Sequence, residues 1–198
     1  ATKDWLQLND LLAETSEMFP QDSIWQRFKG DSLMQQRPPR EEEAIAAYKV
    51  AFEMDVDRQN MKTLATLYVK RGEADKALSI IREHPKLARD QPVIQAVRGR
   101  ALAVTRRSEE AASAFRIAIG LCKKMSELEV VTNHLRVAFG PKKGLEFLLA
   151  ETAGLSDKPW AELVAARYEM AVGLKKEARD RYMAVESRIG PDSPYRMD

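Results

Sequence analysis

The side chains best suited to metal binding and covalent catalysis are scarce in this sequence, which holds one cysteine, Cys122, and two histidines, His84 and His134. A structural zinc site needs about four Cys, His or carboxylate ligands, and a cysteine nucleophile needs a base beside it. The histidines lie 50 residues apart, and neither has a cysteine or carboxylate at metal-ligand spacing. We therefore interpret both as surface or packing residues and Cys122 as a small buried apolar residue. We predict no metal, no cofactor and no enzymatic activity.

Phosphate-binding loops and nucleophile elbows are built from closely spaced glycines. The nine glycines of this sequence are instead dispersed, which predicts that they mark turns.

The composition describes a folded globular chain, with 198 residues of which 44% are hydrophobic and 31% charged. The formal net charge is only +2, so charge does not predict a nucleic-acid partner. A single cysteine cannot form an intrachain disulfide, which favours a reducing, cytoplasmic location. No stretch approaches the roughly 18 consecutive apolar residues of a membrane span.

The sequence contains an internal repeat of 33 to 34 residues. The phrase EEEAIAAYKVAFEMD at 41–55 recurs in altered form, and each copy places a small residue four positions before a large apolar one. The small residues are Ala44, Ala77, Ala111, Gly144 and Ala178, and the large ones are Tyr48, Ile81, Phe115, Leu148 and Tyr182. Such a period is typical of helical repeat arrays, in which small residues let helices approach closely and large ones fill the space between pairs.

Each repeat has the pattern of two helices joined by a tight turn. In 58–71 apolar residues recur at helical spacing, and Gly72 stands where a capping glycine would end the helix. The same pattern predicts helix pairs at 23–36 and 40–54, 58–71 and 74–84, 92–105 and 108–122, 125–138 and 141–151, and 158–172 and 175–189. The period-two alternation of strands does not occur.

These features resemble the tetratricopeptide repeat (TPR) family, whose unit of 34 residues is a helix-turn-helix. The residues that match its pattern best are Leu64, Ala65, Tyr68, Gly72 and Ala77 in one repeat and Ala44, Tyr48 and Ala51 in another. The resemblance covers nearly the whole chain. It implies an all-α fold, a right-handed α-solenoid of helix-turn-helix repeats, that binds protein partners in a concave groove.

The period divides the chain into one array. Its parts are a half repeat at 1–20, repeats at 23–57, 58–91, 92–124, 125–157 and 158–191, and a tail at 192–198. Trp25 and Trp160 begin first helices, where the resemblance implies a structural role, whereas Trp5 falls in the half repeat. Repeat arrays usually end in polar capping helices. The open ends of this array therefore predict self-association or docking on another part of a larger protein.

The resemblance implies that the first helix of each pair lines the groove. The partner-binding residues predicted on this basis are Lys62, Thr66, Val69, Lys70, Val97, Arg100, Val104, Asn133, Arg136 and Val137. This set combines apolar valines with basic side chains. A surface of this kind suits an extended or helical peptide of acidic character.

We favour a non-catalytic protein–protein interaction module. The alternative is a structural spacer or self-association scaffold within a larger protein. A third interpretation, binding of single-stranded RNA by related helical repeats, fits the period but not the charge. An RNA-binding groove repeats a base-reading polar residue at one place per unit, and Lys62, Ala96 and Glu129 do not form such a series.

Overall fold

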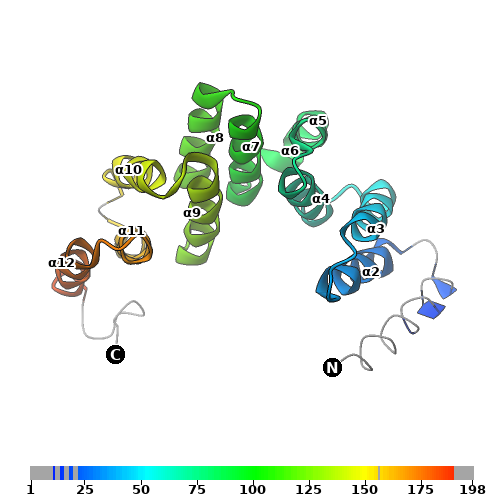
Figure 1. Ribbon diagram of the computed structural model, residues 1–198, viewed down its shortest axis with the longest axis horizontal. Helices are drawn as coiled ribbons and strands as arrows, with labels where there is room; N and C mark the ends of the chain where they lie inside the picture. Colours follow the sequence, from blue (N-terminus) through cyan, green and yellow to red (C-terminus); the bar gives the residue numbers. More distant parts are fainter. Residues whose placement is uncertain (1–10, 12–13, 16–17, 20–21, 156, 190–198) are drawn as a thin grey trace. The chain divides into compact units, whose positions relative to one another are not determined.

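The computed structural model describes residues 11, 14–15, 18–19, 22–155 and 157–189, and the regular elements in that part of the chain are all α-helices (Figure 1). The all-α helical-repeat fold predicted from the sequence is confirmed. Most of the half repeat predicted at 1–20, including Trp5, and the tail predicted at 192–198 lie outside the described residues. The chain forms two compact units, residues 1–88 and 89–198.

The first unit contains helices α2 (Ser23–Gln35), α3 (Glu41–Met54), α4 (Arg58–Lys70), α5 (Ala74–Glu83) and the single turn α6 (Pro85–Ala88). Helix α3 packs against α2 on one side and α4 on the other, and α4 also packs against α5. The turn α6 was not predicted. Proline at its first position is compatible with a helix start, because the first turn does not need its missing N–H.

The second unit contains α7 (Pro92–Val104), α8 (Ser108–Leu121), α9 (Met125–Phe139), α10 (Pro141–Thr152), α11 (Pro159–Ala171) and α12 (Lys175–Glu186). The first helices are neighbours, since α9 packs against both α7 and α11 (Figure 1). Every predicted helix pair is present in the described part of the chain, with ends that differ by at most three residues. The exact division into repeats stays a prediction.

Aromatic rings lie directly on helical glycines in both units. A Cβ atom added to Gly30 would lie 2.7 Å from the Tyr48 ring, and one added to Gly99 would lie 2.8 Å from the Phe115 ring. The prediction that the glycines mark turns is therefore wrong for these two positions, and also for Gly120 and Gly144, which lie within α8 and α10. At Gly30 and Gly99 glycine is needed because it has no Cβ, which lets the ring of the second helix approach the backbone of the first.

Replacing Gly99 by alanine should therefore destabilise the protein by about 1 kcal/mol, although alanine has the better helix propensity by about that amount. The reason is that Phe115 is fully buried and packs edge-to-face on Phe139, so its ring cannot move away. Chemical denaturation measures the effect. The matched control is Gly120→Ala in α8, where an added Cβ meets nothing within 4 Å and the same change should stabilise. Equal effects of the two substitutions would contradict the packing argument.

Three helix-to-helix turns share one backbone geometry. At Gly72 and Gly173 the backbone φ angle is +80° and +89°, and the following N–H donates to the carbonyl five residues earlier. Arg106 occupies the same place after α7, with φ of +61° and the same hydrogen bond from Arg107 to Leu102. It is the one described residue other than glycine with a positive φ.

Arg106→Gly should raise the free energy of unfolding by up to about 1 kcal/mol. A left-handed backbone costs a side-chain-bearing residue about 1–2 kcal/mol, and the greater freedom of glycine in the unfolded chain offsets part of that gain. Thermal or urea unfolding of the variant tests this. Arg106→Ala is the control, because it removes the side chain and keeps the strain. A stability gain in both variants would assign the effect to the arginine side chain instead.

Candidate functional site

The predicted partner-binding residues fall on three first helices that belong to different units. Helix α4 of the first unit carries Lys62, Thr66, Val69 and Lys70. Helices α7 and α9 of the second unit carry Val97, Arg100, Val104, Asn133, Arg136 and Val137.

On α4 the predicted residues are already engaged by their own chain. The Lys70 ammonium lies 2.6 Å from a Glu41 carboxylate oxygen on α3, and this hydrogen bond lowers the pKa of Glu41. The Thr66 hydroxyl donates to the Lys62 carbonyl, at 2.7 Å. Val69 is only 3% exposed. Of the two lysines predicted on α4, Lys70 is therefore engaged by a carboxylate of its own chain, and Lys62 is the better candidate for a partner contact.

Two valines of the predicted set must be corrected. Val69 and Val97 are 3% and 0% exposed, so they belong to the packed interior and cannot line an accessible surface. The reason is that a first helix packs on its own second helix and on its neighbours, which leaves only a narrow stripe open. Val104 and Val137 are accessible, with 52% and 58% of their surface exposed.

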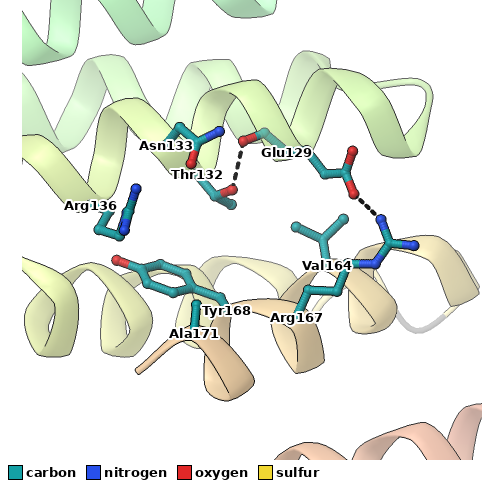
Figure 2. A pocket seen from close by; sticks show the side chains of 8 residues that line it. All are labelled: Glu129, Thr132, Asn133, Arg136, Val164, Arg167, Tyr168 and Ala171. Atoms are coloured by element: carbon teal, nitrogen blue, oxygen red, sulfur yellow. Dashed lines mark hydrogen bonds and ion pairs between the residues drawn. The ribbon is translucent and has the colours of Figure 1, made fainter. Parts of the chain in front are cut away.

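A pocket of about 320 Å³ opens between α9 and α11 in the second unit (Figure 2). It is lined by Glu129, Thr132, Asn133, Arg136, Val164, Arg167, Tyr168 and Ala171. Asn133 and Arg136 were predicted as binding residues, and the structure brings both to this pocket. The last first helix, α11, was left out of the predicted set. The signal was present in the sequence, because Arg167 follows Asn133 by one 34-residue repeat.

The two ends of the pocket differ in charge. At one end Arg167 of α11 and Glu129 of α9 form an ion pair, while the Glu129 carbonyl accepts a hydrogen bond from Thr132 (Figure 2). At the other end Figure 2 shows the Tyr168 ring directed towards Arg136. Arg136 makes no ion pair with any residue that the structure describes. This end of the pocket therefore carries a positive charge that no carboxylate of the described residues pairs with.

Tyr168 is held in place by packing. It is 6% exposed, and its hydroxyl occupies the space that a Cβ at position 144 would need, which explains why Gly144 stands where other repeats have alanine. The hydroxyl has no hydrogen-bond partner within the described part of the chain. Burial raises the pKa of Tyr168, and the nearby Arg136 charge opposes this shift. The phenol therefore stays protonated at neutral pH and is able to donate a hydrogen bond.

A second pocket, of about 340 Å³, lies between α10, α11 and α12, and its charged lining residues are already paired within the chain. Its charged lining residues are Glu162 and Arg181. Glu162 lies 2.6 Å from Arg188, and Arg181 makes two hydrogen bonds with Glu169, at 2.7 and 3.0 Å. Because these charges are satisfied within the chain, we take the α9/α11 pocket as the candidate site.

Cys122 and His84, which were first considered as catalytic or metal-binding residues, are packed against other parts of the chain. The Cys122 thiol is buried, donates to the Ala118 carbonyl at 3.2 Å, and has its pKa raised to about 12 by burial. His84 packs edge-to-face on Phe52, with ring centroids 5.1 Å apart. Among the described residues no group of three or more His, Cys, Asp or Glu could hold a metal ion.

None of the helices described here is long and apolar enough to cross a membrane.

Comparison with solved structures identifies the fold. The chain is similar to a chain in the crystal structure of the APC/C hetero-tetramer Cut9-Hcn1, with a TM-score of 0.56 and 14% sequence identity over 98% of this chain and 38% of that one. It is also similar to the TPR domain of P58(IPK), with a TM-score of 0.45 and 17% identity over 97% of this chain and 58% of that one. This chain thus spans less than two thirds of either.

Neither a protein-family model nor a curated protein matches the sequence. At these identities the similarity concerns the fold alone, which is that of a TPR-like helical-repeat protein.

Proposed function

We propose that this TPR-like chain is a non-catalytic protein-interaction module that binds an extended, acidic segment of a partner protein on the first helices of its second unit. The observation that carries the proposal is the α9/α11 pocket, in which Arg136 has no acidic partner among the described residues. A guanidinium binds a carboxylate through paired, charge-assisted hydrogen bonds. A partner carboxylate is therefore the group that best complements this pocket.

Apolar surface beside the pocket supports a peptide ligand. Val137 is 58% exposed one residue after Arg136, Val130 is 39% exposed on the same helix, and Val104 is 52% exposed on α7. Isolated exposed valines are common, but these three lie on packed neighbouring helices. They offer apolar contacts to a segment whose acidic side chain reaches Arg136. Lys62, Thr66 and Lys70 stay in the proposal as a second contact surface, on the first unit.

Selection from a library of random twelve-residue peptides displayed on phage tests this function on the full chain. We expect acidic sequences to be enriched, and we expect Arg136→Glu to weaken their binding at least about tenfold, because it replaces attraction by repulsion. The matched control is Lys143→Glu, which changes an exposed cation on α10, outside the pocket. If no peptide is enriched, or if both variants lose binding equally, the proposed site is wrong.

A cytoplasmic location and the absence of a nucleic-acid partner rest on the sequence alone. The net charge of +2 gives no basic excess for a polyanion, and the single cysteine suits a reducing compartment.

One observation favours self-association as a second candidate function. Phe19 and Phe28, with 54% and 43% of their surface exposed, flank the Trp25 ring in the first unit, at centroid distances of 6.4 and 5.9 Å. Exposed aromatic clusters often mark interfaces. Light scattering over a dilution series would show an oligomer that dissociates and that Phe28→Ser abolishes. A monomer at every concentration would exclude this candidate.

A further inference from the structure

The second helices α10 and α12 each begin with two exposed lysines. We call this set the basic edge, and its members are Lys142, Lys143, Lys175 and Lys176. None of the four forms an ion pair with a residue in the part of the chain described. The two pairs lie 33 residues apart, close to one repeat, so they occupy equivalent turns.

Both turns lie at the same edge of the second unit. The first helices α9 and α11 pack against each other, and their pocket residues run in the same direction, from Glu129 to Arg136 on α9 and from Val164 to Ala171 on α11 (Figure 2). The turns that lead into α10 and α12 therefore start from neighbouring helix ends. Packed helices lie about 8–10 Å apart, so the two lysine pairs form one basic surface.

The fold itself does not require lysines at these positions. The N-terminal end of a helix carries a partial positive charge, so lysines in the first turn are unfavourable there. The first turns of α3 and α8 are acidic instead, at 41–43 and 109–110. In the first unit the matching turn is also neutralised, because Lys70 lies 2.6 Å from Glu41. Lysines that two repeats place against the helix dipole and leave unpaired point to a role in binding.

Exposed apolar side chains lie beside these lysines. Leu174, directly before Lys175, is 40% exposed, and Met170 in the last turn of α11 is 47% exposed. Pro141, directly before Lys142, is also exposed. Cations beside protruding apolar side chains are typical of proteins that lie on anionic membranes. The apolar groups enter the boundary between headgroups and acyl chains, and the lysines contact the anionic headgroups.

Two features favour a lipid surface over an acidic protein segment. A guanidinium holds one carboxylate in a fixed geometry, whereas the lysine ammonium is a point charge on a flexible stem, which adapts to many phosphate groups. The two pockets described above are lined by other residues than the basic edge and Leu174. A partner that presents a broad anionic surface therefore suits this edge better than a peptide that needs a groove.

We propose that the basic edge binds the surface of membranes that contain anionic lipids, with its four lysines contacting lipid phosphate groups and with Leu174 and Met170 entering the interface. This goes beyond the proposed function, because it uses residues outside the α9/α11 pocket and a different class of partner. The contact is peripheral and reversible, since it depends on surface charge and on shallow apolar burial.

Co-sedimentation of the full chain with lipid vesicles tests the proposal. One set of vesicles contains equal parts of phosphatidylcholine and phosphatidylserine, and the other contains phosphatidylcholine alone. We expect the chain to sediment with the anionic vesicles only. Added salt should weaken this binding, because it screens the charges.

Variants of matched charge locate the contact. Lys175→Glu with Lys176→Glu should weaken binding to the anionic vesicles at least about tenfold. The control is Lys123→Glu with Lys124→Glu, which makes the same charge change in an exposed lysine pair at the start of α9, the opposite end of that helix from the basic edge. The control should weaken binding less than about threefold, since these lysines would face away from the lipid.

Leu174→Ser tests the apolar part of the contact. Leu174 is the N-cap residue of α12, a position that favours serine, so the variant should fold, and circular dichroism checks this for every variant. We expect binding to weaken about fivefold with its salt dependence unchanged.

Three results would overturn the proposal. They are an absence of vesicle binding, equal sedimentation with both kinds of vesicle, and equal loss in the two lysine-pair variants. Fluorescence anisotropy with labelled polyglutamate identifies the other class of partner. Binding of polyglutamate that Lys175→Glu with Lys176→Glu abolishes, without binding to vesicles, would assign the basic edge to an acidic protein instead.

Discussion

Replacing Arg181 by methionine should lower the free energy of unfolding by about 3 kcal/mol. Arg181 of α12 makes two hydrogen bonds with Glu169 of α11, and the Glu169 side chain is 3% exposed while that of Arg181 is 29% exposed. Removing the guanidinium would leave a buried carboxylate without a cation, which typically costs 3–5 kcal/mol. We expect the lower end of this range because water reaches the Arg181 side of the pair. Urea unfolding at pH 7 measures the change.

Two further variants separate the lost ion pair from lost packing. The double variant Glu169→Leu with Arg181→Met removes both charges, and it should recover most of the stability, since apolar replacements of buried pairs are often neutral or stabilising. Arg167→Met breaks the exposed pair with Glu129 and should cost less than about 1 kcal/mol. A double variant as unstable as Arg181→Met alone would show that the arginine acts through its packing.

The helices and their pairing were predictable because they depend on local patterns. Small residues such as Ala44 and Ala111 recur with the repeat period, and both are fully buried in the structure. Each repeat contacts mainly its neighbours, so the pattern within one unit carries most of the information about its packing. For the same reason the helix ends were predicted to within three residues.

The site was predicted less well, because exposure depends on what packs nearby. Val97 and Val104 lie seven residues apart on α7, which places them close to the same helical face. Yet Val97 is buried, and Val104, the last residue of α7, is exposed. A sequence pattern predicts on which helical face a residue lies, but not how deeply that residue is buried. The ion pair between Lys70 and Glu41, which lie 29 residues apart in the sequence, was likewise not predicted.

Gly99 and Arg106 lie at backbone positions that their residue types alone would not predict, and the reason is geometric in both cases. Gly99 lies inside a helix because the Phe115 ring needs the space of its missing Cβ, whereas Arg106 occupies a left-handed turn that glycine fills after α4 and α11. The need for glycine at position 99 depends on a contact between two helices, whereas the left-handed backbone at Arg106 depends on its position within the repeat. Aligning Arg106 with Gly72 predicts the left-handed turn; residue type alone would exclude it.

Acidification from pH 7 to pH 5 should lower the free energy of unfolding by about 2 kcal/mol through His134 alone. Burial first, and then the nearby Arg100 charge, lowers the pKa of His134 to about 4 in the folded protein. An unfolded histidine has a pKa of about 6.5, so only the unfolded chain takes up this proton between pH 6.5 and pH 4. The His134 contribution is therefore absent above pH 6.5 and destabilises increasingly as the pH falls towards 4.

Urea unfolding of the wild type and of His134→Gln at pH 7 and pH 5 isolates this effect. Carboxylates titrate alike in both proteins, so the difference between the two pH dependences belongs to position 134. Arg100→Leu should reduce the loss only in part, because its charge is the smaller of the two causes. An unchanged pH dependence in His134→Gln would contradict this argument, because it would mean that His134 has the same pKa in the folded and the unfolded protein.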